Sequence, residues 1–440
     1  MKTDIRSKIK SNFAWLALDK TLAIFHSLIV GAIVARYLGP SLFGILAFAG
    51  AISVSMKPLI TWGGDNVVTR DFVSQEDRGE LFWSVFFSRM ILGLIIFLLV
   101  AICITTGLIE LSGATEVWVV IIYSLPLIFS GFEIAVLVLR SQHRNVFAVV
   151  AANVVLMAVS LTKLVLVYQQ MSLIWFAAIT STNAILAGIS VFWITQRIGL
   201  VPAPRLPSKR VLIELIQECW PLILSALSVV LYMNVDTIML RLMHTTEEAG
   251  IYSVAVRLSM VWYFVPVVLG MSFLPWLTRT YQDRQENYMQ ALARFFEVNA
   301  LLSYASVVIA LIAFPTIIYY LFGPDYSESI SVFRWHVFGI IFVFMGNARG
   351  QHLNLAKLHK VSMLSTVAGM LVNVVLNLIL IPSYASHGAA IATVAGFAVA
   401  GLVSSFFFKG LVDVARLQVQ SWLVAPTKSI SILKEAVRVQ

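Results

Sequence analysis

The stretch VARYLGPSLFGILAFA, residues 34–49, decides the fold because it places a polar turn between two long apolar runs. The Gly39-Pro40 pair supplies the turn, and Arg36 suits the headgroup level of a membrane. A looser version, LRLMHTTEEAGIYSVA, begins at Leu240. We interpret both stretches as outer corners of membrane hairpins, in a chain that is built twice.

The composition excludes a soluble globular protein. Hydrophobic residues make up 59% of the 440 residues, and mean hydropathy is +0.88. Charged residues make up only 12%, against roughly 25% in soluble chains. Apolar runs of about 20 residues, the length that crosses a hydrocarbon core as a helix, recur throughout. We therefore predict an all-α polytopic membrane protein with about twelve transmembrane helices. The expected spans lie near residues 12–34, 41–60, 81–106, 117–139, 146–168, 173–196, 212–240, 249–275, 293–320, 331–347, 360–381 and 387–410.

The distribution of cations predicts the sidedness of these helices. Of the 31 lysines and arginines, 23 fall at the N-terminus, in the even-numbered connections or in the C-terminal segment. Positive charge marks the cytoplasmic side, so both termini are expected there. The basic first segment lacks a cleavage site and is interpreted as a retained helix rather than a signal peptide. The net charge of +9 therefore reflects topology, and we expect no nucleic-acid partner.

Two six-helix halves are expected. The segment RIGLVPAPRLPSKR, residues 197–210, is rich in proline and basic residues and lies between the sixth and seventh spans. Arg36 and Gly44 match Arg241 and Gly250 in the second half. Because six spans return the chain to its starting side, the halves are expected to be parallel pseudo-symmetric repeats, with binding between them. The expected boundaries are a first half at 1–196, a cytoplasmic linker at 197–211, a second half at 212–411 and an amphipathic cytoplasmic tail at 412–440.

Charged residues at membrane depth are the candidate functional residues. Each costs about 2.5–3.5 kcal/mol at a helix centre, so we expect them to face an interior or a wet cavity. The surplus is positive, which suits an anionic cargo such as a diphosphate. The candidate substrate-binding cations are Lys20, Lys57, Arg89, Lys163 and Arg257, and the candidate ion-coupling acids are Asp19, Glu133 and Asp236.

Ion pairing is the alternative interpretation of several of these charges. Asp236 and Arg257 lie at similar depth and could neutralise each other as a structural pair. Glu133 and Arg89 are also expected at similar depth. Lys163 completes a polar stripe on the fifth helix, while Asn373 and Asn377 form another on the eleventh. For these asparagines, hydrogen bonds between helices explain the pattern equally well.

The segment NFAWLALDK, the RYLGPSLFG core at residues 36–44 and the Trp62-Gly63-Gly64 segment together resemble a known family. They are similar to the start of the Wzx-type polysaccharide (O-antigen) flippases, in the multidrug/oligosaccharidyl-lipid/polysaccharide exporter superfamily. The resemblance implies a two-lobed bundle with a cationic cavity in the bacterial inner membrane. It also implies outward flipping of an undecaprenyl-diphosphate-linked oligosaccharide by exchange against protons or sodium.

Other classes of protein remain open. A multidrug exporter of the same architecture is the main alternative, although cationic drugs favour an acidic cavity. A glycan polymerase or ligase would need a large outer loop, whereas the outer connections hold about a dozen residues or fewer. Cys103 and Cys219 have no metal-like spacing, and we expect neither enzymatic activity nor a cofactor. The expected partners are lipid-linked oligosaccharide, a proton or sodium ion, membrane lipid and polysaccharide polymerase machinery.

Overall fold

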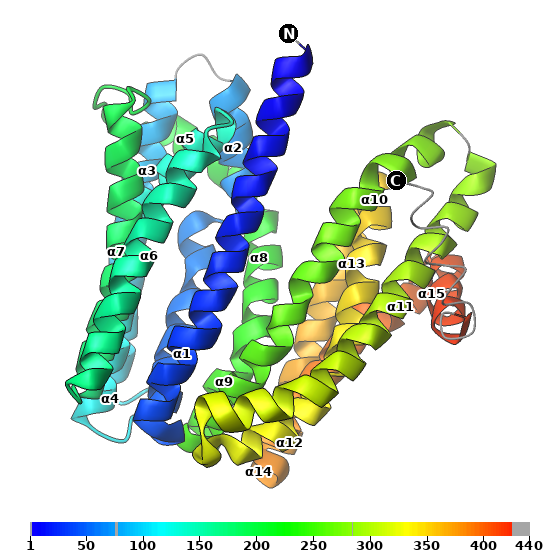
Figure 1. The fold of residues 1–440 in the computed structure, drawn as a ribbon. Coiled ribbons are helices and arrows are strands. Elements are labelled where there is room, and N and C mark those ends of the chain that lie inside the picture. Colours follow the sequence, from blue (N-terminus) through cyan, green and yellow to red (C-terminus); the bar gives the residue numbers. More distant parts are fainter. Residues whose placement is uncertain (1, 75–77, 284, 425–440) are drawn as a thin grey trace. The chain divides into compact units, whose positions relative to one another are not determined.

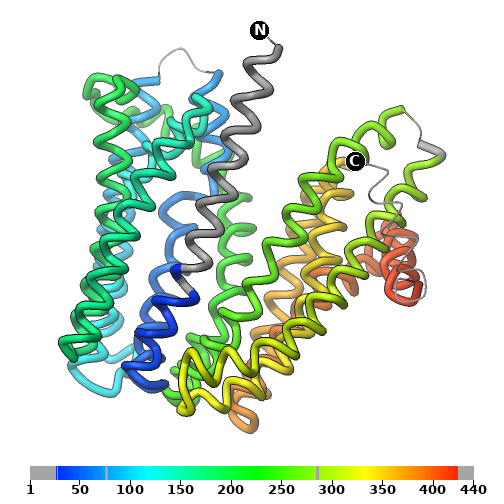
Figure 2. Tube along the Cα trace, viewed as in Figure 1, coloured from blue at the N-terminus to red at the C-terminus, as the bar shows by residue number. Residues whose placement is uncertain are grey.

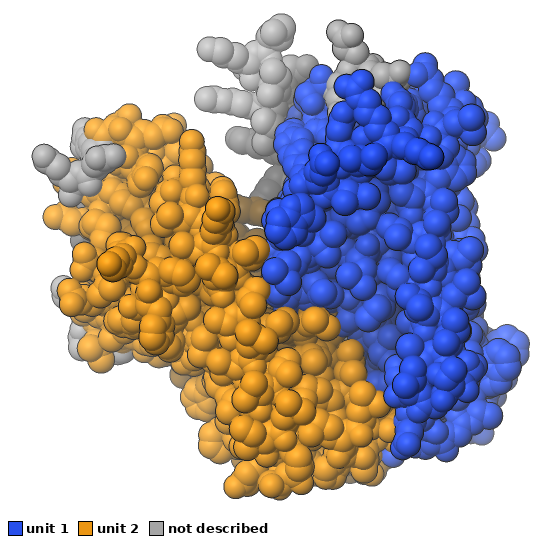
Figure 3. Space-filling model, turned by 180° about the vertical axis from the view of Figure 1, so that it is seen from behind, with its two compact units in different colours: residues 1–230 blue, residues 231–440 orange. Residues whose placement is uncertain are grey.

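A computed structural model describes residues 2–74, 78–283 and 285–424, with side chains from residue 26 onward except at residues 27, 285 and 286. The described residues form helices joined by short connections and contain no strand (Figure 1). The chain divides into two compact units, residues 1–230 and 231–440, and the division falls inside one long helix, α8 (Figure 3).

Unit 1 begins with α1, in which the chain turns back on itself at Gly39 (Figure 2). Gly39 has φ 72° and ψ 169°, a conformation that glycine adopts without steric cost. The turn expected at Gly39-Pro40 is therefore confirmed, and the adjoining Arg36 is exposed. The elements of unit 1 are α1 (Lys2–Thr61), α2 (Asp65–Ser74), α3 (Arg78–Thr105), α4 (Ala114–Ser124), η1 (Leu125–Leu127), η2 (Ser130–Glu133), α5 (Ile134–Ser141), α6 (Asn145–Tyr168), α7 (Leu173–Arg197) and the first part of α8 (Lys209–Met243).

The fourth expected span is broken rather than continuous. Pro126 lies in a short 3-10 segment that begins at Leu125 directly after α4, and the two parts of the span meet at 43°. Gly93 of α3 lies directly against the carbonyl of Leu127 at this break, so α3 fits only because residue 93 has no side chain. Glu133 ends the second 3-10 segment and is thereby positioned at the bend.

The basic helix ends of unit 1 share one end of its bundle. The C-terminal ends of α2 and α7 and the start of α6 lie at this end, and the start of α4 and the end of α6 lie at the other (Figure 1). The proline-rich connection after α7 packs onto the bundle, because Trp83 Nε1 donates to the carbonyl oxygens of Pro202 at 3.2 Å and Ala203 at 2.9 Å. The alternation of basic and non-basic ends agrees with a helical hairpin series.

Unit 2 continues from α8 and contains a second hairpin inside one long helix. In α14 the chain departs from helical geometry at Ala385, with φ 45° and ψ −128°. The two arms then pack closely, since a Cβ on Gly369 would meet the Cβ of Ala400 at 2.6 Å. The further elements are α9 (Thr246–Met260), η3 (Val261–Tyr263), α10 (Phe264–Asp283), α11 (Gln285–Ile317), η4 (Ile318–Phe322), η5 (Pro324–Tyr326), α12 (Ser327–His336), α13 (Gly339–Leu355), α14 (His359–Gly401), η6 (Val403–Phe407) and α15 (Val412–Val424).

The expected membrane fold is confirmed. Among the described residues, eight helices are long and apolar enough to cross a membrane, and two bent pairs raise the number to ten. Because α1 and α14 each join two helices at a turn, dividing both gives the twelve spans expected from the sequence. The last span ends earlier than expected, at Gly401, and α15 follows it.

Candidate functional site: the oxygen cluster at Asp236

Asp236 is the centre of a buried polar cluster in unit 2. It lies on α8 with 1% of its surface exposed. Asn373 donates to its Oδ1 at 2.9 Å, and Asn377 donates to the same oxygen. The hydroxyls of Tyr252 and Thr393 each lie 2.8 Å from Oδ2. We call these five residues the Asp236 cluster.

The two arms of α14 assemble this cluster. Asn373 and Asn377 are one helical turn apart on the first arm, and Thr393 lies on the second arm. The turn at Ala385 brings the arms together, and the glycines at 369 and 396 let them approach closely. The asparagine stripe therefore does bond between helices, and the partner that it bonds is the candidate ion-coupling acid.

The partners of Asp236 are all neutral. The sequence suggested Arg257 as its partner, but the hydrogen bonds to this carboxylate come from two amides and two hydroxyls instead. Arg257 lies half-buried on α9 and interacts electrostatically with Tyr326. A buried carboxylate surrounded by neutral groups needs a positive charge to balance it, and a bound proton or cation can supply that charge.

The number of protons available to the cluster also indicates a bound proton or cation. Four oxygen–oxygen distances of 2.8 Å connect Asp236 Oδ2, the Tyr252 hydroxyl, the Thr393 hydroxyl and the carbonyl of Ala389. Two hydroxyl groups have only two protons to share among these four contacts. A third proton on the carboxyl satisfies one more contact, and a small cation among the oxygens would also hold them together.

The donor set fits a hard cation. Carboxylate, amide, hydroxyl and carbonyl oxygens are the ligands that such ions prefer. The amides of Asn373 and Asn377 donate to Asp236 as drawn, and rotation of either amide by half a turn would present its oxygen instead. Within the described ranges, no three His, Cys, Asp or Glu residues lie together as a transition-metal site would require.

Three candidate charges of unit 1, Lys57, Arg89 and Glu133, form ion pairs. Lys57 Nζ lies 2.6 Å from Glu133 Oε1, and both side chains are accessible, at 43% and 37% exposure. Arg89 instead contacts Asp65, with Nη2 2.7 Å from Oδ1. Arg89 is 1% exposed, whereas the Asp65 side chain is 48% exposed. Glu133 and Arg89 are therefore not partners of each other, as their similar depth had suggested.

The remaining candidates lie on α1 and α6. Lys163 is half-buried on α6, three residues after Ser160. The Ser160 hydroxyl lies 2.6 Å from Nδ1 of His26, so the polar side of α6 contacts α1. Lys20 and Asp19 lie on α1, but their side chains are outside the described residues.

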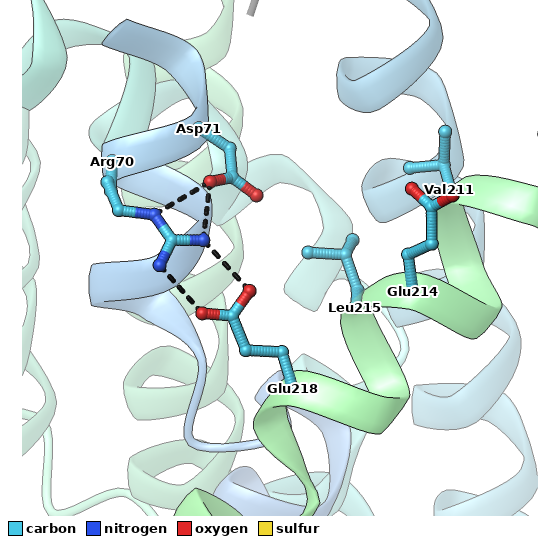
Figure 4. Close-up of a pocket in the computed structure, with 6 residues that line it drawn as sticks. All are labelled: Arg70, Asp71, Val211, Glu214, Leu215 and Glu218. Atoms are coloured by element: carbon cyan, nitrogen blue, oxygen red, sulfur yellow. Dashed lines mark hydrogen bonds and ion pairs between the residues drawn. The ribbon is translucent and has the colours of Figure 1, made fainter. Parts of the chain in front are cut away.

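A second polar feature of unit 1 was not expected from the sequence. Arg70 of α2 forms a two-pronged contact with Glu218 of α8, at 2.6 and 2.8 Å, and also bonds Asp71 (Figure 4). These residues line a cavity of about 170 Å³ together with Val211, Glu214 and Leu215. Because Arg70 is already neutralised, we interpret the cavity as part of the junction between α2 and α8.

Sequence reasoning missed Asp65, Tyr252 and Thr393 as partners. Asp65 begins α2, a ten-residue helix that the hydrophobic pattern of the sequence did not predict. Thr393 is one turn before Phe397 in an apolar span, where a single hydroxyl gives no periodic signal. Tyr252 follows the GI pair of the second hairpin, and only its depth could have suggested a role.

The fold is that of a multi-pass helical membrane protein, and the Asp236 cluster is a buried carboxylate with neutral hydrogen-bond partners. A comparison with family models extends this assignment. The model for polysaccharide biosynthesis proteins matches residues 9–281, and the MatE model matches residues 221–379. The chain belongs to the polysaccharide biosynthesis protein family. These matches confirm the resemblance to the multidrug/oligosaccharidyl-lipid/polysaccharide exporter superfamily. No curated protein matches the chain.

Solved structures share the fold at low sequence identity. The lipid II flippase MurJ in an inward closed conformation is 15% identical, with a TM-score of 0.73, and the match covers 96% of this chain and 92% of that one. An inward-facing multidrug resistance MATE family transporter is 14% identical, with a TM-score of 0.65 and coverage of 96% and 99%. A transporter of the same superfamily from Pyrococcus furiosus, described as having a binding pocket of reverse polarity, is 15% identical, with a TM-score of 0.54 and coverage of 92% and 93%.

Proposed function

We propose that the chain is a flippase that moves an undecaprenyl-diphosphate-linked oligosaccharide across the bacterial inner membrane. Both termini would be cytoplasmic, and transport would occur by alternating access coupled to proton or sodium exchange. The family of polysaccharide biosynthesis proteins supports a glycan cargo. The fold shared with a protein named as a lipid II flippase supports a lipid-linked one.

The observation that carries the coupling proposal is the neutral surrounding of Asp236. Its four partners hold the carboxylate in place but leave its charge unbalanced, so a proton or sodium ion completes the cluster. Glu133 already faces Lys57 at 2.6 Å, which makes it a weaker candidate for the same role. We therefore assign coupling to Asp236, with Glu133 and Asp19 as secondary candidates.

The substrate diphosphate would meet the cations that remain accessible. Lys57 is 43% exposed beside Glu133, while Lys163 and Arg257 are half-buried. Arg89 would contact a headgroup only by exchanging its partner Asp65. We keep these four with Lys20 as the proposed substrate contacts, and we rank Lys57 first because its partner could be displaced by a doubly charged headgroup.

Reconstitution in proteoliposomes tests this proposal. The purified full-length chain is mixed with fluorescent undecaprenyl-diphosphate-linked glycan, and flipping is followed with an imposed sodium gradient, an imposed proton gradient or neither. We expect one of the two gradients to accelerate flipping, and replacement of Asp236 by asparagine to remove that acceleration. Flipping that is absent under all three conditions would reject the cargo.

A multidrug exporter of the same fold is the second candidate. It is favoured by the MatE match over residues 221–379 and by the MATE structures of similar fold. Expression in a drug-sensitised strain separates the candidates, since only the exporter would raise resistance.

A further inference from the structure

A second polar layer lies one helical turn from the Asp236 cluster. Tyr232 precedes Asp236 by four residues on α8, and Phe397 follows Thr393 by four residues on α14. The rings of Tyr232 and Phe397 lie 4.8 Å apart, while the next turn joins Asp236 to Thr393. Both pairs keep the same antiparallel register, so this layer lies toward the N-terminal end of α8.

The layer consists of four rings, which we call the Phe397 layer: Phe397, Tyr232, Tyr263 and His336. Tyr263 and His336 present their rings edge-on to Phe397, with centroids 6.0 and 6.3 Å away. His336 is also 6.1 Å from the ring of Tyr252, which belongs to the Asp236 cluster. The two layers are therefore in direct contact.

Three polar atoms of the Phe397 layer are buried without a hydrogen bond. Among the described residues, the hydroxyls of Tyr232 and Tyr263 and the Nδ1 atom of His336 have no partner. Tyr232 and His336 are only 6% and 1% exposed. Each unsatisfied buried group lowers the free energy of unfolding by about 1–3 kcal/mol. Three such groups around one ring therefore indicate a functional role.

The charge of Asp236 connects these atoms to the cluster. Both tyrosine hydroxyls interact electrostatically with its carboxylate. Hydroxyl and imidazole groups can accept from water, donate to it or face a passing cation. Phe397 fills the centre of the layer with an apolar ring. A set of polar atoms around one apolar ring would bind water only when that ring moves aside.

We propose that the Phe397 layer is the route by which the cation at Asp236 exchanges with the compartment at the N-terminal end of α8. Water bound by Tyr232, Tyr263 and His336 would carry the proton or hydrated ion past Phe397. This assignment rests on the proposed function, in which Asp236 binds the coupling cation. With the proposed topology, that compartment is the cytoplasm.

Removal of the unpaired hydroxyls tests the route. We compare Tyr232→Phe, Tyr263→Phe and the double variant in proteoliposomes, measuring exchange of radioactive sodium and, separately, proton release after a pH jump. No protein hydrogen bond is lost, so the unfolding temperature should not fall. We expect equilibrium cation binding to stay within about twofold, while the loss of one hydrogen-bonding group slows exchange by about two- to tenfold per hydroxyl.

Tyr288→Phe is the matched control in the same unit. Its hydroxyl bonds His352 Nδ1 at 2.8 Å, away from the Phe397 layer. This variant should lower the unfolding temperature and leave exchange unchanged. Wild-type exchange in the double variant would overturn the route, as would slower exchange matched by an equal loss of stability.

Asp236→Asn separates this inference from the function on which it depends. If Asp236→Asn blocks cation exchange but the double tyrosine variant does not slow it, only the route is wrong. If Asp236→Asn exchanges cations at the wild-type rate, the coupling role of Asp236 fails as well.

Discussion

Asp236 differs from Glu133 and Asp65 in the kind of partner that it has. Glu133 and Asp65 each face a cation, whereas the four partners of Asp236 are amides and hydroxyls. A fixed cation would compete with an incoming one, and neutral donors do not. This distinction is the reason that we propose a coupling role for Asp236 and a structural role for the other two carboxylates.

Replacing Asp236 by asparagine should abolish coupling while keeping the shape of the site. The amide takes up no proton and carries no negative charge to hold a sodium ion. Because a charge-assisted bond is worth about 1.5–3 kcal/mol, we expect cation-driven flipping to fall by about tenfold or more. Flipping in proteoliposomes measures this. Asp413→Asn is the control, because that exposed side chain bonds only Arg416 on α15 at 3.3 Å. An equal loss in both variants would contradict the assignment.

The Lys57–Glu133 pair should tune affinity for the anionic substrate. Lys57→Ala removes a cation and should raise the KM for the diphosphate substrate several-fold. Glu133→Gln frees the same cation and should leave KM unchanged or lower it. Since the pair is half-exposed, each change should alter stability by only about 1 kcal/mol or less.

Arg210 and Glu214 provide the control for this prediction. They form an exposed pair of similar geometry, 2.9 Å apart on α8. Substitutions there should leave KM unchanged. If Lys57→Ala and Arg210→Ala have the same effect on KM, the proposed contact between Lys57 and the substrate is wrong.

At the residue scale, depth in the membrane can be predicted from the sequence, but the partner of each charge cannot. Asp236 stands out because a carboxylate in an apolar run is costly wherever the run folds. Its partner Thr393 is 157 residues away, on the second arm of α14. Arg89 was expected beside Glu133 because both lie at similar depth, but depth alone leaves the direction of a side chain undetermined.

The two hairpin corners, in α1 and α14, show how elements are ended inside a membrane protein. Gly39 occupies a left-handed conformation suited to glycine, whereas Ala385 occupies one with φ 45° and carries a side chain. The backbone NH of Ser386 donates to Glu248 at 3.1 Å, which helps to hold the second corner. The chain therefore reverses direction without backbone strain at Gly39 and with backbone strain at Ala385.

Exchanging glycine and alanine at the corners should shift stability in opposite directions. Gly39→Ala should destabilise unit 1 by about 1 kcal/mol, because alanine is disfavoured at positive φ. Ala385→Gly should stabilise unit 2 by up to a similar amount, since it relieves that strain. Thermal unfolding in detergent measures both changes.

Gly350→Ala is the control for the corners. Gly350 lies inside α13, and a Cβ there would meet nothing within 4 Å. Helix propensity alone then predicts a gain of about 1 kcal/mol. If Gly39→Ala is as stabilising as Gly350→Ala, the corner conformation is not the one described here.

At the element scale, the periodic and apolar segments were predictable and the breaks within them were not. The turn at Gly39 followed from a Gly-Pro pair between two apolar runs. The breaks in the fourth and tenth spans, bent by 43° and 44°, lie inside segments that the sequence predicted as single spans. Pro126 is consistent with the break in the fourth span, but a proline in a membrane helix is also compatible with a mild kink.

At the scale of the whole molecule, composition and charge pattern are sufficient to define the class of protein. Hydropathy requires a membrane bundle, and the turns divide it into twelve spans. The expected boundaries at the proline-rich linker remain a prediction, and the described units meet within α8 instead of at that linker.

A deletion strain can distinguish a lipid-linked glycan substrate from a drug substrate. Loss of a flippase leaves lipid-linked glycan on the cytoplasmic leaflet, so a deletion strain should lack surface polysaccharide and regain it when this chain is expressed. Drug sensitivity should be unchanged by that expression, because the proposed cargo is an anionic lipid-linked glycan. Restored drug resistance without surface polysaccharide would favour the exporter.

The most direct measurement is cation-driven flipping of undecaprenyl-diphosphate-linked glycan by the purified chain and its Asp236→Asn variant. We expect a sodium or proton gradient to accelerate flipping by the wild-type chain and to have no effect on the variant. Equal acceleration of both proteins would contradict the coupling role of Asp236, on which the proposed mechanism depends.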